Sequence, residues 1–558
     1  MNGAQVVVEI LKREGANTIF GYPGGVALPL YDALYDSGIR HILTRHEQGA
    51  AHAADGYARS TGKVGVCLST SGPGATNLVT GIATAYMDSS PMVCITCQVT
   101  TNAIGKDSFQ EADMRGITTP ITKHNYLIRS PKDLAPCLRQ AFYIARTGRP
   151  GTVVVDIPKD IFTAEIDVDF DEKIHLRGYK PLFEGDMKQI EAAAEMIKKA
   201  RKPLFFVGGG MDSDDRARDF AALVKKTNIP VVSSLMGNAV FPNTDPLYLG
   251  MLGMHGTVTA NKAAMECDLL IGLGVRFSDR VTGNTKAFAP NAKLLQFEID
   301  AVEINKNIKV DARDLADLSW SLPKLLEIVE RPDDDAWVDM LLQTKAEKPV
   351  SYGASKNGEI KPQMVIETIS RVTKGEPIVV TDVGQQQMWT ALLYQFKYPR
   401  HFLSSGGLGT MGFGLPAGIG AQIGNEDKEV WVIAGDGGFL MNIQEIATAV
   451  EHQLPLKIAV INNRCLGMVQ QWQRLFYGQR YSGSKYYIDT DFAKVAEAFG
   501  AKGLRISKLT DLEDAIKTAH AEKGPMVLDF MVTEDENVFP MVPAGASLND
   551  IMEWKEED

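Results

Sequence analysis

The stretch AGDGGFLMNIQEIATAVEHQLPLKIAVINN, residues 434–463, contains the pattern that decides the fold of this protein. One apolar run, EVWVIAGDG, ends around Asp436, and a second, LKIAVINN, ends at Asn463, with the helical segment MNIQEIATAVEH between them. A strand, a helix and a second strand in this order predict two parallel strands of one sheet. Both polar side chains then lie at the carboxyl edge of that sheet, where folds of this kind bind ligands.

This pair of side chains suits a divalent cation that is also bound to phosphate. One carboxylate oxygen and one amide oxygen are ligands that Mg²⁺ accepts, while phosphate and water fill its remaining positions. Gly435, Gly437 and Gly438 let the backbone approach an anion closely and offer N–H groups at the start of a helix. Taken singly, the glycine-rich turn and the strand end would have no special meaning, but together they predict a diphosphate and metal site.

The charge balance excludes several classes of partner. The chain of 558 residues has 69 acidic and 58 basic side chains and a net charge of −11. Nucleic acids and anionic membranes bind surfaces with clustered Lys and Arg, so neither is an expected partner. No apolar run approaches the roughly eighteen residues that span a bilayer, and the N-terminus reads as an amphipathic helix rather than a signal peptide. We therefore expect a cytoplasmic protein.

Two of the six cysteines, Cys94 and Cys97, form a CxxC inside PMVCITCQV, which reads as a buried strand. An offset of three residues along a strand places the two thiols on opposite faces of the sheet. We interpret them as small buried apolar groups rather than as a redox pair.

Strand-like and helix-like segments alternate in three blocks along the chain. This alternation predicts an α/β protein built from three doubly wound parallel-sheet domains. We place these domains at residues 1–180, 181–345 and 346–558. The helical pattern DMKQIEAAAEMIKKARK opens the second block, and a charged, proline-containing linker with one short helix leads towards the third.

The GDG-to-NN pattern resembles the diphosphate and magnesium motif of thiamine-diphosphate enzymes. In that family a main-chain carbonyl two residues beyond the final Asn is a further metal ligand, which implies the carbonyl of Cys465. The segment RHEQGAAHAADGYARS resembles the family's activating-glutamate segment and implies that Glu47 activates the aminopyrimidine of the cofactor. His46-Glu47 does not begin a zinc-binding HExxH, because no His follows at the required offset. GYARSTGKV likewise lacks the spacing of a phosphate-binding loop.

Two more segments complete the implied cofactor site. LSSGGLGTMGFGLPAG, residues 403–418, implies that Met411 is the apolar wedge between the two rings, and TDVGQQQMW, residues 381–389, implies glutamines facing the diphosphate. The contacts with thiamine diphosphate implied by the resemblance are Glu47, Gln385, Gln386, Gly409, Met411, Gly435, Asp436, Gly437, Gly438, Asn463, Gly467 and Met468. The implied ligands of Mg²⁺ are Asp436, Asn463 and Cys465.

Over essentially its full length the chain resembles the large catalytic subunit of acetolactate synthase. The segments that carry this resemblance are GYPGG (21–25), SGPGATN (71–77), DSFQEAD (107–113), GRPGTVVVDIPKD (148–160), LGMHG (252–256), VRFSDRVTGN (275–284), GMVQQWQ (467–473) and VFPMVPAGASLNDI (538–551). Departures from the family pattern are Ser278, where Asp is usual, and Gly438, where Ser is common.

The resemblance implies a thiamine-diphosphate-dependent transferase of branched-chain amino-acid (valine, leucine and isoleucine) biosynthesis. Pyruvate is decarboxylated, and its two-carbon unit is joined to a second pyruvate or to 2-oxobutyrate. Arg280 would bind the acceptor carboxylate through its planar fork, and Trp472 would contact the extra methyl group of 2-oxobutyrate. Met254 and Met468 would line the same pocket. Besides Glu47, the implied catalytic residues are Gly25, whose N–H would face a developing oxyanion, Gln110 and Lys159.

The middle block matches the family's FAD-binding domain, although it lacks GxGxxG. Carboligation involves no net electron transfer, so we expect a structural or vestigial role for the flavin. The implied FAD contacts are Arg149, Gly208, Gly209, Gly210, Met254, His255, Gly256, Gly274, Arg276, Glu298, Asp300 and Asp311.

The resemblance also implies partner subunits. In this family Glu47 of one subunit meets the diphosphate site of another, so a homodimer or homotetramer is expected, together with a small regulatory subunit.

Three alternatives remain open at this level. Arg280 and Trp472, in segments typical of acetolactate synthases, argue against a pyruvate oxidase or a 2-oxo acid decarboxylase. A catabolic acetolactate synthase binds no flavin, so the purified protein would lack the visible absorption of FAD. A non-catalytic nucleotide-binding protein of the same fold would have no reason to retain Glu47.

Overall fold

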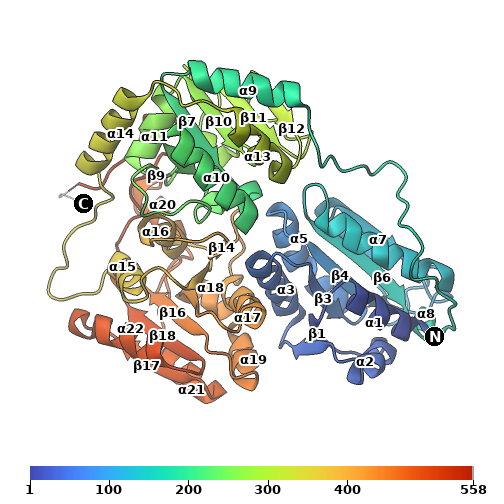
Figure 1. Ribbon diagram of the computed structural model, residues 1–558. Coiled ribbons are helices and arrows are strands. Elements are labelled where there is room, and N and C mark those ends of the chain that lie inside the picture. The colour runs from blue at the N-terminus through green and yellow to red at the C-terminus, as the bar shows by residue number, and fades with distance from the viewer. Residues whose placement is uncertain (556–558) are drawn as a thin grey trace.

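The computed structural model describes residues 1–555 and contains three six-stranded parallel sheets, one in each of three α/β domains (Figure 1). The predicted fold class is therefore confirmed. The strands lie within residues 18–158, 203–315 and 378–531, inside the three predicted domain ranges. The boundaries of those ranges stay predictions.

The N-terminal sheet has the strand order β2-β1-β3-β4-β6-β5, and helices cover both of its faces (Figure 1). Cys94 belongs to the buried cluster on one face and Cys97 to the cluster on the other, as the spacing predicts. The strands are β1 (Thr18–Tyr22), β2 (Arg40–Leu43), β3 (Gly65–Ser69), β4 (Met92–Gln98), β5 (His124–Leu127) and β6 (Thr152–Pro158). The helices are α1 (Gly3–Arg13), α2 (Leu28–Tyr35), α3 (Glu47–Thr61), α4 (Pro73–Asn77), α5 (Val79–Met87), α6 (Met114–Thr118), η1 (Thr119–Ile121), η2 (Pro131–Asp133), α7 (Leu134–Arg146) and α8 (Lys159–Thr163).

The middle domain begins with the predicted helix α9 (Met187–Lys199), and its sheet has the order β12-β11-β10-β7-β8-β9. The predicted short helix of the linker is α14 (Asp335–Glu347). The strands are β7 (Pro203–Val207), β8 (Val231–Ser233), β9 (Tyr248–Met251), β10 (Leu269–Leu273), β11 (Lys293–Glu298) and β12 (Ala312–Leu315). The other helices are η3 (Gly209–Met211), α10 (Asp214–Thr227), η4 (Leu235–Gly237), α11 (Val258–Glu266), α12 (Asp279–Thr282) and α13 (Leu318–Ile328).

The C-terminal domain has the strand order β14-β13-β15-β16-β18-β17. Its strands are β13 (Ile378–Thr381), β14 (Phe402–Ser404), β15 (Val430–Gly435), β16 (Lys457–Asn462), β17 (Lys502–Ile506) and β18 (Met526–Met531). Its helices are α15 (Pro362–Val372), α16 (Gln385–Leu393), α17 (Gly414–Gly424), α18 (Asp436–Met441), η5 (Ile443–Glu445), α19 (Ile446–Glu451), α20 (Gly467–Phe476), α21 (Phe492–Phe499), η6 (Leu509–Asp511) and α22 (Leu512–Ala521).

The predicted helical segment, residues 441–452, forms η5 and α19 in the structure, and a separate helix, α18, precedes it. The break between α18 and η5 lies at Asn442, whose φ is −131°. The Asn442 side chain donates a hydrogen bond to the carbonyl oxygen of Gly412 at 2.7 Å. A contact with a distant loop therefore decides the break, which local helical periodicity does not reveal.

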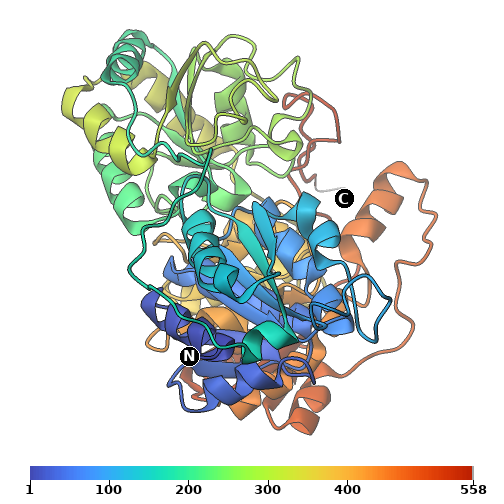
Figure 2. The ribbon, with the colours of Figure 1, turned by 90° about the vertical axis from the view of Figure 1, so that its right-hand side faces the viewer.

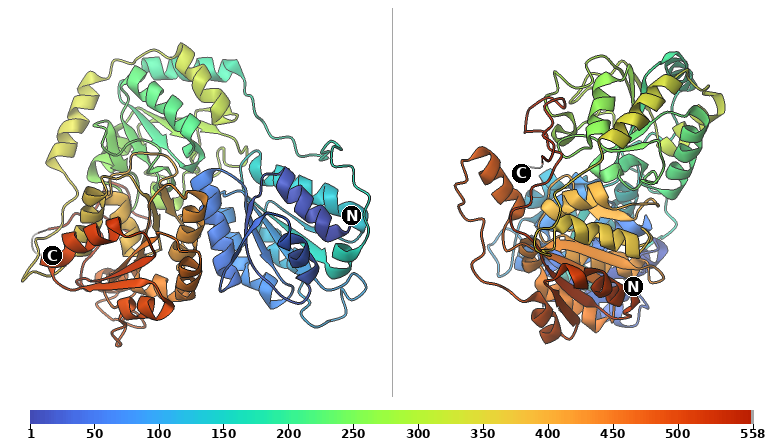
Figure 3. Two further views of the ribbon diagram at one scale, coloured as in Figure 1. Left: turned by 60° about the horizontal axis from the view of Figure 1, so that its bottom comes forward. Right: turned by 90° about the vertical axis from the view of Figure 1, so that its left-hand side faces the viewer.

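The first and third domains share one buried core, because α3 packs directly against α17 (Figure 3). Glycines make this close contact of two helices feasible. A Cβ atom on Gly56 would overlap the carbonyl oxygen of Ala417, and one on Gly420 would overlap that of Ala53.

The middle domain lies above the other two in the view of Figure 2, and the chain crosses to it twice. After β18, residues 533–552 return to this domain, where Val542 N–H donates to the Met254 carbonyl oxygen at 2.7 Å. No helix within residues 1–555 is long and apolar enough to cross a membrane.

Candidate active site

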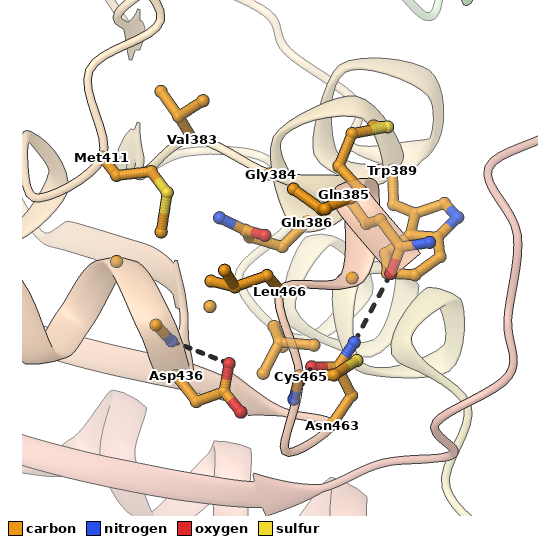
Figure 4. Close-up of a pocket in the computed structure, with 17 residues that line it drawn as sticks. Val383, Gly384, Gln385, Gln386, Trp389, Met411, Asp436, Asn463, Cys465 and Leu466 are labelled. Carbon is orange, nitrogen blue, oxygen red and sulfur yellow. Dashed lines mark hydrogen bonds between the residues drawn. The ribbon is translucent and has the colours of Figure 1, made fainter. Parts of the chain in front are cut away.

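A pocket opens at the carboxyl edge of the third sheet, where β13, β15 and β16 end and helices α16, α18 and α20 begin (Figure 4). Because all strands of this sheet are parallel, their polar end residues meet at one edge. The pocket is lined by Val383, Gly384, Gln385, Gln386, Trp389, Met411, Gly435, Asp436, Gly437, Gly438, Ile461, Asn463, Cys465, Leu466, Gly467, Met468 and Val469.

Asp436 and Asn463, the two predicted metal ligands, face this pocket together (Figure 4). Asp436 is the first residue of α18 and is 4% exposed. One of its carboxylate oxygens accepts a hydrogen bond from Gly437 N–H at 2.7 Å, while the other, Oδ2, is buried and has no partner among residues 1–555. Burial raises the pKa of Asp436 to about 7, so a cation beside it would restore the carboxylate.

The loop after β16 supplies the remaining predicted ligands. Asn463 Oδ1 accepts a hydrogen bond from Cys465 N–H at 3.3 Å, and the Asn463 amide contacts Gln385 Oε1 at 3.4 Å. Burial raises the pKa of the Cys465 thiol to about 12, and sulfur is a soft ligand that Mg²⁺ does not favour. A hard cation would instead take the carbonyl oxygen, as expected. The unpartnered carboxylate oxygen of Asp436 and these neutral oxygens fit Mg²⁺ that also binds phosphate.

The opposite wall of the pocket comes from α16 and the loop before α17. Met411 and Gln386 both extend into the pocket (Figure 4), and the Nε2 atom of Gln386 is buried with no hydrogen-bond partner within residues 1–555. Gln385 donates through Nε2 to Gln471 Oε1 and to the Glu536 carbonyl oxygen, each at 2.8 Å. The structure leaves Gly409 exposed and outside the pocket lining.

Asp382, which sequence reasoning missed, organises this wall. Its buried carboxylate accepts hydrogen bonds from the N–H groups of Gly412 at 3.0 Å and Gly414 at 2.9 Å. These bonds fix the backbone directly after Met411. A signal was available, because Asp382 follows β13 just as Asp436 follows β15.

Glu47 lies outside the lining of this pocket, at the carboxyl edge of the N-terminal sheet. It is the first residue of α3 and is 8% exposed. Asn77, the last residue of the segment SGPGATN, donates a hydrogen bond to Glu47 Oε2 at 2.9 Å. The hydroxyl of Thr70 nearby is buried without a partner among the described residues.

The other three predicted catalytic residues lie at the same edge of the N-terminal sheet. Gly25 follows β1 and is exposed, with open space where a side chain would extend. Gln110 lies in the loop that packs on Gly72, where a Cβ would come within 2.7 Å of the Gln110 carbonyl oxygen. Lys159 is the exposed first residue of α8.

Comparison with known proteins shows to which family the chain belongs. Models of the thiamine pyrophosphate enzymes match the chain three times: the N-terminal TPP binding domain at residues 1–117, the central domain at 190–325 and the C-terminal TPP binding domain at 382–530. The acetolactate synthase large subunit of Corynebacterium glutamicum is 48% identical, covering 99% of this chain and 90% of the relative. The chain belongs to the acetolactate synthase large-subunit family.

Two further relatives agree. The probable acetolactate synthase large subunit of Methanocaldococcus jannaschii is 47% identical over 99% of this chain and 95% of its own length. The acetolactate synthase large subunit of Haemophilus influenzae is 45% identical over 100% of this chain and 99% of its own length. The predicted family and the predicted thiamine-diphosphate enzyme activity are thereby confirmed.

In this member of the acetolactate synthase family, three of the predicted acceptor residues come together. The guanidinium carbon of Arg280 lies 5.9 Å from the centre of the Trp472 ring, and its Nη1 lies 3.5 Å from Met254 Sδ. Met254 N–H donates to the Arg280 carbonyl oxygen at 2.8 Å. Met468 is four residues before Trp472 on α20 and lines the cofactor pocket instead.

Most of the predicted flavin residues gather at the carboxyl edge of the middle sheet. Arg149 reaches this edge from the N-terminal domain and pairs with Glu303 at 2.7 Å and Asp300 at 3.3 Å. Burial raises the pKa of neighbouring Glu298 to about 7. The residues at or beside this edge are Gly208, Gly209, Gly210, Met254, His255, Gly256, Gly274, Arg276, Glu298 and Asp300.

Asp311 is the exception among the predicted flavin contacts. It precedes β12, and its carboxylate accepts a hydrogen bond from Leu294 N–H at 2.8 Å, near the amino end of β11. The structure therefore places Asp311 at the opposite edge of the sheet. Beyond the carboxyl end of β12 lies Asp317, the N-cap residue of α13, which pairs with Arg216 at 2.8 Å.

Proposed function

We propose that this chain catalyses the acetolactate synthase reaction, joining a two-carbon unit from pyruvate to a second pyruvate or to 2-oxobutyrate, the first common step of branched-chain amino-acid biosynthesis. The main support for this proposal is helix α20. Its first turn lines the cofactor pocket, and Trp472 in its second turn stacks against the Arg280 guanidinium. A cofactor pocket and a cationic acceptor site on one helix suit a reaction between two 2-oxo acids.

The proposed cofactors are thiamine diphosphate, Mg²⁺ and FAD. Thiamine diphosphate, when bound, supplies the electron sink that decarboxylation requires. Asp436, Asn463 and the Cys465 carbonyl would hold Mg²⁺, while N–H groups at the start of α18 would bind the diphosphate. Arg149 and the glycine-rich ends of β7 and β10 would bind FAD in a structural role.

Glu47 is proposed to hold and release the proton at the far ring nitrogen of the aminopyrimidine. The hydrogen bond from Asn77 orients its carboxylate for this task. The residues that line the cofactor pocket lie between 383 and 469 and do not include Glu47, which supports a Glu47 supplied by a second copy of the chain. A homodimer or larger homo-oligomer is therefore part of the proposal, as is a small regulatory subunit, which the name "large subunit" of the relatives suggests. The cytoplasmic location stays a prediction.

At the acceptor site, Arg280 would bind the carboxylate of the second substrate. Its side chain is 57% exposed and, among the described residues, pairs only loosely with Asp279 at 3.8 Å, so the fork remains accessible to a ligand. Trp472 and Met254 supply the apolar surface beside it. Binding would thus fix the keto carbon near the pocket mouth and exclude water from it.

The decisive experiment is product analysis with the purified protein, pyruvate, Mg²⁺, thiamine diphosphate and FAD. We expect 2-acetolactate, and 2-aceto-2-hydroxybutyrate when 2-oxobutyrate is added. Acetate or acetaldehyde as the main product would refute the proposal in favour of an oxidase or a decarboxylase. A visible flavin spectrum of the isolated protein separates the proposed enzyme from a flavin-free acetolactate synthase. Asp436→Ala is the matched inactive control.

A further inference from the structure

Glu445 places a buried carboxylate from the C-terminal domain against the N-terminal domain. It is the last residue of η5 and is 0% exposed. Its Oε1 atom accepts hydrogen bonds from the N–H groups of Arg45 and His46, each at 3.0 Å. Its Oε2 atom accepts one from the Thr448 hydroxyl at 2.7 Å. The Arg45 N–H also lies 3.2 Å from Oε2, so both oxygens of this carboxylate are held by hydrogen bonds.

The two N–H groups that Glu445 binds belong to the residues directly before Glu47. N–H groups at and before the start of a helix have no partners inside that helix, so an outside acceptor decides how the backbone enters it. The ring of His46, the N-cap of α3, accepts a hydrogen bond from Gln48 N–H at 3.1 Å. The His46 N–H is left for Glu445.

Helix α3 leaves room for the Glu445 carboxylate at Gly49. Gly49 lies one residue beyond Gln48 on α3, and a Cβ atom at Gly49 would overlap Oε1 of Glu445. Gly49 has no left-handed backbone conformation that would require glycine, so the close approach of Glu445 is the physical reason for glycine there.

We propose that Glu445 is a positioning residue for Glu47: by holding the N–H groups of Arg45 and His46, it fixes the direction in which the Glu47 side chain leaves the backbone. The inference rests on the proposed role of Glu47 in activating the cofactor. The contacts lie inside one chain, and through them a residue of the C-terminal domain sets the orientation of Glu47 in the N-terminal domain.

Two measurements test the proposal without substrate turnover. The first is amide hydrogen exchange of residues 45 and 46 in the cofactor-free protein, which should accelerate at least tenfold in Glu445→Ala. The second is exchange of the C2 proton of bound thiamine diphosphate for deuterium in the absence of pyruvate. This rate should fall about 10- to 100-fold, the cost typical of misplacing a reacting group by about 1 Å. Cofactor affinity should stay within about threefold of the parent.

Matched variants separate positioning from general damage. Glu451→Gln removes the carboxylate that pairs with the Arg45 side chain on the surface, and it should leave both rates unchanged. Glu445→Gln, which retains one acceptor oxygen, should give intermediate rates. If Glu445→Ala fails to fold, Gly49→Ala provides the same test, because it displaces the carboxylate without deleting it.

A C2 exchange rate equal to the parent's in Glu445→Ala, with amides 45 and 46 exposed, would overturn the proposal. Unchanged protection of those amides would overturn it as well. Failure of the underlying role of Glu47 is recognised separately, because Glu47→Gln would then retain fast C2 exchange even though Glu445 is intact.

Discussion

Arg59 joins the domains through a buried cluster of charges, and its replacement gives a quantitative test of the fold. Its side chain is 9% exposed and donates to Asp55 Oδ1 at 2.7 Å, to Asp88 Oδ2 at 3.0 Å and to the Ser404 carbonyl oxygen at 2.7 Å. Asp88 in turn accepts hydrogen bonds from the N–H groups at the start of the loop that carries Met411, including that of Gly407 at 2.6 Å.

Arg59→Met fills a similar volume but leaves two buried carboxylates without their cation. Removing one partner of a buried ion pair costs about 3–5 kcal/mol. At about 2–4 °C for each kcal/mol in a cooperative unit of 150–250 residues, the unfolding midpoint of the cofactor-free protein should fall by about 6–20 °C. Cofactor affinity should fall too, because the loop is anchored through Asp88.

The loss of stability in Arg59→Met should depend on pH in a defined direction. Burial raises the pKa of Asp88 above its ordinary value of 3.8, and Arg59 opposes that rise. Without Arg59 the folded variant retains a proton on Asp88 that the unfolded chain releases, so its stability falls as pH rises above 3.8. The deficit should be largest near pH 8 and smaller near pH 5.

Differential scanning fluorimetry of the cofactor-free protein between pH 5 and 8.5 measures this deficit. Arg59→Lys, which retains the charge but loses the fork, should show a smaller loss than Arg59→Met. A midpoint for Arg59→Met within 2 °C of the parent at pH 8, or a deficit that grows towards pH 5, would refute the reasoning.

Three substitutions test the proposed chemistry. Glu47→Gln should bind thiamine diphosphate with near-parent affinity yet lose most turnover, and undiminished acetolactate formation would exclude its assigned role. Asp436→Ala should lose the magnesium dependence of cofactor binding, which a fluorescence titration with and without Mg²⁺ measures; identical curves for variant and parent would argue against the metal site. Trp472→Leu should shift acceptor choice towards pyruvate when pyruvate and 2-oxobutyrate compete, and an unchanged product ratio would remove Trp472 from the acceptor site.

The pocket residues that directly follow a strand could be predicted from the sequence. Asp436 and Asn463 follow apolar runs, and parallel strands bring their carboxyl ends to one edge, so periodicity and chain order suffice. Asp382 follows the same rule and could have been found by it. Asp311 shows the limit of the family resemblance, which implies a flavin contact at a residue that the structure places before β12, at the amino edge of the sheet.

Contacts between distant segments were beyond prediction. Nothing near Glu445 in the chain indicates that its carboxylate binds the N–H groups of residues 45 and 46, about 400 positions away. The break at Asn442 has the same cause, since a hydrogen bond to Gly412 outweighs the local helical preference.

The amino-acid sequence by itself determined three parallel-sheet domains, the family, and the strand ends that carry the metal ligands. These follow from short-range periodicity and from the fixed direction of parallel strands. Only the tertiary structure decided that α3 and α17 join the first and third domains through their glycines, and that a carboxylate of one domain holds the helix start of another. Such contacts depend on how finished domains fit together, and that fit is set by shape and burial rather than by any local pattern of residues.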